Sequence, residues 1–279
     1  MKERVYAAKL LKISFILLGA AVTFGCAATT DQIKPEAVPE IRPGFLLGYL
    51  DENDLPNSKA LLPPPPAEGS AAKALDEEIS RKALSLRGTP RWSLAAQDAE
   101  LSFPEVAVTF SCALNVPVTE QHTPSLYMLL RRTLTDAGLS TSSAKNHYSR
   151  SRPFMENKEP TCSPEWEAHL MKDGSYPSGH TAIGWAWALI LSEIAPDLSD
   201  RIIARGLAYG QSRVVCNVHW QSDVIAGRLI AAATVARLHA NPAFIRDLEA
   251  AKADVASARA KGLTPSRNCE TEAAALALF

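Results

Sequence analysis

The chain has 279 residues, of which 47% are hydrophobic and 21% are charged, and its formal net charge is −1. This length can hold one large hydrophobic core, and the composition excludes a largely disordered chain. The near-neutral balance also excludes a protein that binds a nucleic acid polymer or an anionic membrane surface through its overall charge, so any basic site must be local.

The first 26 residues have the three parts of an export signal. Basic residues up to Lys12 precede an apolar run over 13–25, and small residues follow from Cys26. This run is shorter than the about 20 residues of a membrane-spanning helix, so we expect a cleaved signal and a periplasmic protein without a membrane span. Cleavage just before Cys26 would instead leave a lipid-anchored cysteine, but Thr23 and Phe24 fit such a site poorly.

Residues 27–70 form a proline-rich segment that includes four consecutive prolines at 63–66. The segment has little helical periodicity, and its composition favours an extended arm that wraps a domain rather than forming one. We therefore expect the domain to cover 71–279.

The rest of the chain has mainly helical periodicity. The segment 181–195 is apolar on most faces, which predicts a buried helix. A β-branched stretch at 106–110 could form a strand, but it has no partner strand. The sequence therefore predicts an all-α, single globular domain without an internal repeat. The expected helices cover 72–86, 123–137, 181–195, 200–214, 219–239 and 241–260.

Four cysteines remain after the signal, and an oxidising compartment favours disulfides between them. Three pairings are possible, and the sequence does not choose among them. Metal ligation is the weaker alternative, because no Cys-x-x-Cys or His-x-x-x-His spacing occurs in the sequence. The four residues are Cys112, Cys162, Cys216 and Cys269.

Three windows of the sequence gather cations and histidines without a neighbouring carboxylate to neutralise them. The first window, 145–154, begins with Lys145 and contains Arg152. A guanidinium can bind two oxygens of a phosphate, and a lysine adds a point charge. A solvated basic loop is the simpler interpretation of this window taken alone.

The second window, 176–180, reads Tyr-Pro-Ser-Gly-His and precedes the apolar helix. Backbone N–H groups at a helix start bind anions, and Gly179 lets the backbone approach closely. Ser178 adds a hydroxyl donor, and His180 would lie beside the anion. An N-cap serine next to an incidental histidine is the alternative.

The third window contains Ser212, Arg213, His219 and Asp223. His219 and Asp223 are four residues apart at the start of a predicted helix, so they share one face. The carboxylate can accept the imidazole proton and select its tautomer, as expected for a nucleophile with an orienting partner. A helix-surface ion pair is the alternative.

Together the windows read Lys-x6-Arg-Pro, Pro-Ser-Gly-His and Ser-Arg-x5-His-x3-Asp. This pattern resembles the signature of the type 2 phosphatidic acid phosphatase superfamily, and every defining position is filled. The flanking residues SYPSGHTA from Ser175 and GQSRV from Gly210 resemble the class A bacterial non-specific acid phosphatases. The motifs span 145–223, and a looser likeness extends over 101–242.

The resemblance implies a fold, an activity and a site. It implies a helical domain of the phosphatidic acid phosphatase type 2 and haloperoxidase type, in a periplasmic homo-oligomer. It also implies an acid phosphatase that hydrolyses many phosphate monoesters, nucleotides included. The implied nucleophile is His219, oriented by Asp223, with His180 as the acid. The implied phosphate-binding residues are Lys145, Arg152, Ser178, Gly179 and Arg213.

The residues themselves support the same chemistry. Lys145, Arg152 and Arg213 can neutralise the phosphoryl charge that Mg²⁺ balances in many enzymes, so no metal or other cofactor is expected. Neutral His219 would attack phosphorus while protonated His180 gives its proton to the leaving oxygen. The sequence leaves open whether His219 is neutral, because Asp223 favours its charged form and the cations favour its neutral form.

Three neighbouring residues could shape substrate choice, but packing is the simpler expectation for each. They are Tyr148, Asp173 and Trp220.

Four other functions use similar residues. A vanadium-dependent haloperoxidase shares the signature, and a phosphotransferase would use the same site. A lipid phosphatase would ordinarily need spanning helices. A phosphate-binding module without turnover would not need both His180 and the pair formed by His219 and Asp223.

Overall fold

The computed structural model describes residues 38–278. The expected signal at 1–26 and the first part of the arm lie outside the described residues. The described part is all-α, as predicted, apart from an antiparallel hairpin of β1 (Glu40–Arg42) and β2 (Phe45–Leu46). Its helices are α1 (Ser58–Leu61), α2 (Ala71–Ala83), α3 (Pro90–Gln97), α4 (Ser111–Leu114), α5 (Pro124–Leu139), α6 (Ser142–Tyr148), α7 (Pro153–Asn157), α8 (Glu167–Leu170), α9 (Gly179–Ile194), α10 (Ser199–Val215), α11 (Gln221–Leu238), α12 (Pro242–Ala260) and α13 (Cys269–Leu276).

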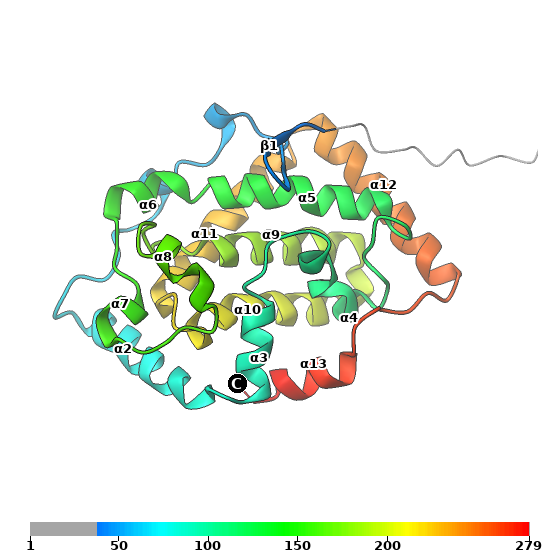
Figure 1. The fold of residues 1–279 in the computed structure, drawn as a ribbon. Coiled ribbons are helices and arrows are strands. Elements are labelled where there is room, and N and C mark those ends of the chain that lie inside the picture. The colour runs from blue at the N-terminus through cyan, green and yellow to red at the C-terminus, as the bar shows by residue number, and fades with distance from the viewer. Residues whose placement is uncertain (1–37, 279) are drawn as a thin grey trace, which may run out of the picture. The chain divides into compact units, whose positions relative to one another are not determined.

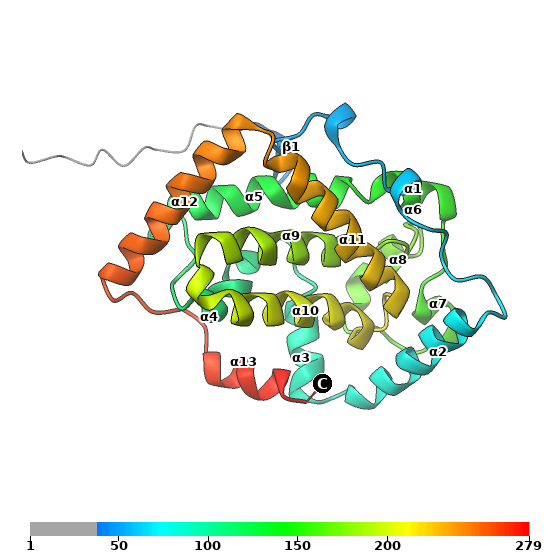
Figure 2. The same ribbon diagram turned by 180° about the vertical axis from the view of Figure 1, so that it is seen from behind.

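Helix α9 is the centre of the fold and packs against α5, α10 and α11. It runs between α5 and α10 in both views (Figure 1, Figure 2). Apart from His180 and Glu193, its residues are apolar or small, so burial on several sides is favourable. Glycine at 184 allows α10 to approach closely, because a Cβ there would collide with the ring of Tyr209.

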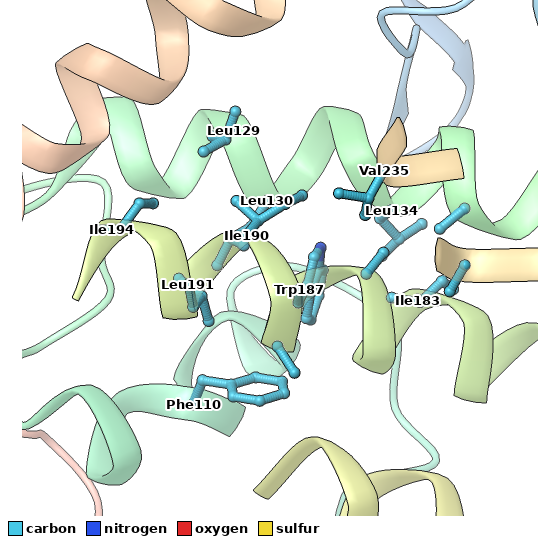
Figure 3. Packing of buried hydrophobic residues seen from close by; sticks show 14 of the residues in the cluster. Phe110, Leu129, Leu130, Leu134, Ile183, Trp187, Ile190, Leu191, Ile194 and Val235 are labelled. Carbon is cyan, nitrogen blue, oxygen red and sulfur yellow. The ribbon is translucent and has the colours of Figure 1, made fainter. Parts of the chain in front are cut away.

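The core lies along α9, between α5 on one side and the segment before α4 on the other (Figure 3). Trp187 of α9 is fully buried, and its indole N–H donates to Thr133 Oγ1 of α5 at 3.1 Å. Phe110 packs edge-on against Trp187, with ring centroids 6.3 Å apart. This packing fixes the middle of α9 in the core, and the three sequence windows meet at its first turn.

The stretch 106–110 does not form a strand. It belongs to a 3₁₀ helix, Glu105–Phe110, which places Phe110 in the core. Other 3₁₀ turns are Glu52–Asp54, Leu84–Leu86, Pro164–Trp166 and Pro196–Leu198.

The described part of the arm contacts the helices. Asp136 of α5 is buried and accepts hydrogen bonds from the backbone N–H groups of Tyr49 and Leu50, at 2.9–3.0 Å. The hydroxyl of Tyr49 donates to Asp247 of α12 at 2.7 Å. Burial raises the pKa of Asp136 to about 6, although the two N–H groups oppose the shift. These bonds join the arm to α5 and α12.

Two disulfides select one of the three possible pairings. Cys112 of α4 bonds to Cys269 at the start of α13, with Cα atoms 5.5 Å apart. Cys162 bonds to Cys216 at the end of α10, with Cα atoms 4.7 Å apart. Across residues 38–278, no helix combines the length and the apolar character needed to cross a bilayer.

Candidate active site

The three windows converge at the first turn of α9. Helix α6 carries Lys145, Arg152 precedes α7, and Ser178 caps α9 by accepting the N–H of Thr181. The backbone N–H of Ser178 donates to the carbonyl of Asp223 at 3.0 Å, which joins the second window to the third. Helix α11 can approach this closely because residue 227 is glycine, where a Cβ would lie 2.6 Å from the Ser178 carbonyl oxygen.

The first and third windows meet at His219, whose side chain is 3% exposed. Its Nε2 lies 3.1 Å from Nη1 of Arg152, and its Nδ1 lies 3.3 Å from Oδ2 of Asp223. A guanidinium can only donate, so Nε2 is the acceptor and carries no hydrogen. The hydrogen of the neutral ring is therefore on Nδ1, facing the carboxylate. This is the tautomer that a nucleophilic Nε2 requires.

Asp223 is fully buried and has two further partners. It accepts the backbone N–H of Trp220 at 2.8 Å and an N–H of Arg150 at 2.6 Å. The other terminal nitrogen of Arg150 donates to Asp76 of α2 at 2.9 Å. Arg150 thus lies between two buried carboxylates and neutralises part of the charge of Asp223.

Arg150 and Asp76 were not expected at the site. Arg150 belongs to the first window, but it faces two protein carboxylates rather than an external anion. Asp76 lies on a different helix, and it also accepts the backbone N–H of Ser222 at 2.8 Å. No local pattern identifies it, because its partners are more than seventy residues away in sequence.

Arg213 lies in the last turn of α10 and is 1% exposed. Its Nε and Nη1 atoms have no hydrogen-bond partner among residues 38–278. Burial is the main cause that lowers its pKa, to about 10. Leaving guanidinium donors unpaired in a buried position is costly, so Arg213 favours an anion as its partner.

The first window is not free of carboxylates, contrary to the expectation from sequence. Oδ2 of Asp173 accepts hydrogen bonds from Nζ of Lys145 at 2.9 Å and from Nη2 of Arg152 at 3.0 Å. Asp173 lies on the loop between α8 and α9. The Asp173 side chain is 37% exposed and forms ion pairs, so it is not a packing residue. Trp220 is 2% exposed and packs, as expected.

His180 lies on the first turn of α9, and its Nε2 is 2.9 Å from the carbonyl oxygen of Ala99. A carbonyl oxygen can only accept, so Nε2 carries a hydrogen and Nδ1 is left for another partner. The neighbouring Asp98 is buried and accepts hydrogen bonds from Ser212 at 2.6 Å and from Arg205. Asp98 precedes Ala99, which contacts His180, and it accepts a hydrogen bond from Ser212 of α10. Asp98 therefore connects the Ala99 segment to the helix that carries Arg213.

The two remaining predicted residues form the start of α9. Ser178 Oγ accepts hydrogen bonds from the backbone N–H of Thr181 at 3.3 Å and from its hydroxyl at 2.9 Å, so its own hydrogen is available to a ligand. A Cβ at Gly179 would lie 3.9 Å from Cε of Lys145, which places the two residues side by side. All eight predicted site residues therefore lie around one end of α9.

Burial and the surrounding cations lower the pKa of both histidines well below the usual 6.5. For His219 the main cause is burial, followed by the charges of Arg152, Lys145 and Arg213. For His180 it is burial, then the charge of Arg213. This answers the question that the sequence left open, because the neutral form of His219 is favoured. Burial also lowers the pKa of Lys145 to about 8.

Among residues 38–278, no group of three or more His, Cys, Asp or Glu side chains has an arrangement that could hold a metal ion. A cavity of about 520 Å³ lies away from the histidines, between α3, α4, α10 and α13, and includes Arg91 and Arg205 in its lining.

Comparison with known proteins places the chain in a family. A family model described as the PAP2 superfamily matches residues 125–245. A non-specific acid phosphatase from Providencia stuartii is 48% identical over 211 residues, which cover 75% of this chain and 85% of that protein. A non-specific acid phosphatase from Salmonella typhimurium is 45% identical, over 69% of this chain and 77% of that protein. An acid phosphatase from Zymomonas mobilis is 41% identical, over 73% and 77%.

The fold and the three motifs therefore define a phosphatase of the PAP2 superfamily. Within that superfamily, the chain belongs to the bacterial non-specific acid phosphatases. It is an enzyme, an acid phosphatase, and the resemblance predicted from its motifs is confirmed.

Proposed function

We propose that this acid phosphatase hydrolyses phosphate monoesters through a covalent phosphohistidine at His219. The observation that carries the proposal is the state of that ring: its Nε2 bears no hydrogen and lies 3.1 Å from a cation of the phosphate site. Its Nδ1 faces Asp223 at 3.3 Å, which stabilises the positive charge that the ring gains as the P–N bond forms.

The first step forms a bond between Nε2 of His219 and phosphorus and breaks the bond between phosphorus and the ester oxygen. Protonated His180 gives its proton to the leaving alkoxide. In the second step water attacks phosphorus with neutral His180 as base, the P–N bond breaks and phosphate leaves. Lys145, Arg152 and Arg213 neutralise the charge on the phosphoryl oxygens in both steps.

The low pKa of His180 gives a reason for activity at acidic pH. The acid form of this residue is needed in the first step, and its surroundings disfavour that form at neutral pH. A bound phosphate dianion raises the pKa of His180 again, because its charge opposes that of Arg213. We expect a bell-shaped profile of kcat/KM with a mildly acidic optimum.

We further propose broad specificity for small monoesters, nucleotides included, and a periplasmic homo-oligomer. The two disulfides support an oxidising compartment. Exposed apolar side chains on α10 and α11, namely Leu207, Ile225 and Leu229, support contact between copies. Light scattering coupled to gel filtration measures the mass of the assembly.

A substrate panel with EDTA across pH 4 to 9 tests the function. We expect turnover of p-nitrophenyl phosphate and nucleotides at acidic pH that survives EDTA. Loss of activity in EDTA that added metal restores would contradict a metal-free mechanism. Bromide oxidation with vanadate and peroxide, in preference to ester hydrolysis, would favour the haloperoxidase, and glycerol added as acceptor measures phosphotransfer.

A further inference from the structure

Asp173 shares its hydrogen-bond partners with the phosphoryl group that the site is proposed to bind. A single oxygen, Oδ2, receives Nζ of Lys145 at 2.9 Å and Nη2 of Arg152 at 3.0 Å. Its side chain is 37% exposed, whereas that of Arg152 is 1% exposed and that of Lys145 is 11% exposed. The carboxylate therefore lies on the solvent side of the two cations.

The two cations have other contacts that hold them in place. Arg152 donates from Nε to the carbonyl oxygens of Leu170 and Asp173, at 2.9 and 3.1 Å, and from Nη1 to that of Val218 at 3.0 Å. Lys145 also donates to the carbonyl oxygen of Gly174. The carboxylate of Asp173 is thus not required to position Lys145 or Arg152.

A phosphoryl dianion that used these N–H groups would meet the carboxylate at close range. Two anions near the same donors repel each other, and each donor hydrogen can serve only one of them well. Because the Asp173 side chain reaches solvent, it can turn outward without losing hydration. Binding of phosphate then requires displacement of Asp173, and release of phosphate is favoured by its return.

We propose that Asp173 is an internal counter-ion that competes with phosphate for Lys145 and Arg152, and that it thereby sets how tightly the enzyme holds substrate and product. The inference rests on the proposed phosphate-binding role of these cations. Asp173 determines affinity in this account and takes no part in bond making or breaking.

The test is the affinity of Asp173→Asn for inorganic phosphate at pH 6, measured by calorimetry and by competitive inhibition. Asparagine keeps the size and one acceptor oxygen but removes the charge. We expect the dissociation constant and KM to fall about fivefold or more, with kcat equal or lower. Asp173→Glu should restore the weaker binding, and Asp173→Ser provides a second neutral variant. Glu159→Gln, in an exposed ion pair with Arg87, is the matched control.

Unchanged or weaker phosphate binding in the folded neutral variants would overturn the inference, because it would assign Asp173 a purely structural role. Arg213→Gln separates this failure from failure of the proposed function. If Arg213→Gln weakens phosphate binding but Asp173→Asn does not tighten it, the site stands and only the counter-ion is wrong. If Arg213→Gln leaves phosphate binding unchanged, the proposed site is wrong and the inference falls with it.

Discussion

His219 contacts Arg152 through Nε2 and Asp223 through Nδ1, and each contact has a different consequence. The contact with Arg152 keeps Nε2 free of hydrogen, and the contact with Asp223 prepares the ring for positive charge. Arg150 adds a third control, because it balances the charge of Asp223 before the reaction begins. In the proposed mechanism, His219 is thus neutral before the reaction, and its positive charge is stabilised once it carries phosphate.

Replacement of Arg150 by Gln tests this balance. Burial raises the pKa of Asp223 and the charge of Arg150 lowers it, so without Arg150 the coupled pair of Asp223 and His219 takes up a proton at higher pH. The reaction needs neutral His219, so the acid limb of the kcat/KM profile should move to higher pH and kcat should fall. Arg150→Lys should restore part of the profile. An acid limb that stays in place in a folded Arg150→Gln variant would contradict this role.

The candidate site residues could be proposed from sequence because the three windows together match one signature, whereas each window taken alone has a simpler interpretation. Asp173, Arg150 and Asp76 could not be assigned, because the partners of each come from other elements. Asp173 pairs with residues 28 and 21 positions away, and Asp76 with one 74 positions away. Only the folded structure shows that Asp173 and Asp76 form ion pairs with cations that lie far from them in sequence.

The sequence predicted the long helices better than the short ones. The apolar periodicity predicted α9 and α10 to within two residues. Helix α3 was not predicted, because Gly88 and Pro90 follow the expected helix 72–86 and are typical of a helix end. They also begin the next one: Pro90 occupies the first helical position, and Thr89 accepts the N–H of Trp92. The short helices α6 to α8 have too few turns for a periodic pattern.

The contact between Asp136 of α5 and the arm can be tested by substitution. In Asp136→Asn, one carboxylate oxygen becomes an amide nitrogen facing the N–H groups of Tyr49 and Leu50. An unsatisfied buried donor costs about 1–3 kcal/mol, so the melting temperature should fall and both amides should exchange faster with solvent. Hydrogen exchange reports the two amides directly. Unchanged protection at Tyr49 and Leu50 would show that Asp136 does not hold the arm.

In the whole molecule, we expect one disulfide to contribute more to stability and the other to contribute more to activity. The Cys112–Cys269 bond spans 157 residues and the Cys162–Cys216 bond spans 54. In the chain-entropy model, loss of the longer loop costs about 1 kcal/mol more. Cys216 lies three residues before His219, so loss of the shorter loop should lower kcat more. Paired Cys→Ser variants, compared by chemical denaturation and by kcat, check both effects. The reverse order for both would contradict this division.

The proposed mechanism depends on a bond between phosphorus and Nε2 of His219, and a rapid acid quench of the enzyme with a ³²P-labelled monoester tests that bond most directly. We expect phosphate bound covalently to His219 within one turnover, labile in acid on standing and stable in base. His219→Ala should carry none, whereas His180→Ala should still be labelled by a substrate with a good leaving group such as p-nitrophenol. Label that persists in His219→Ala, or that maps to another residue, would contradict the account.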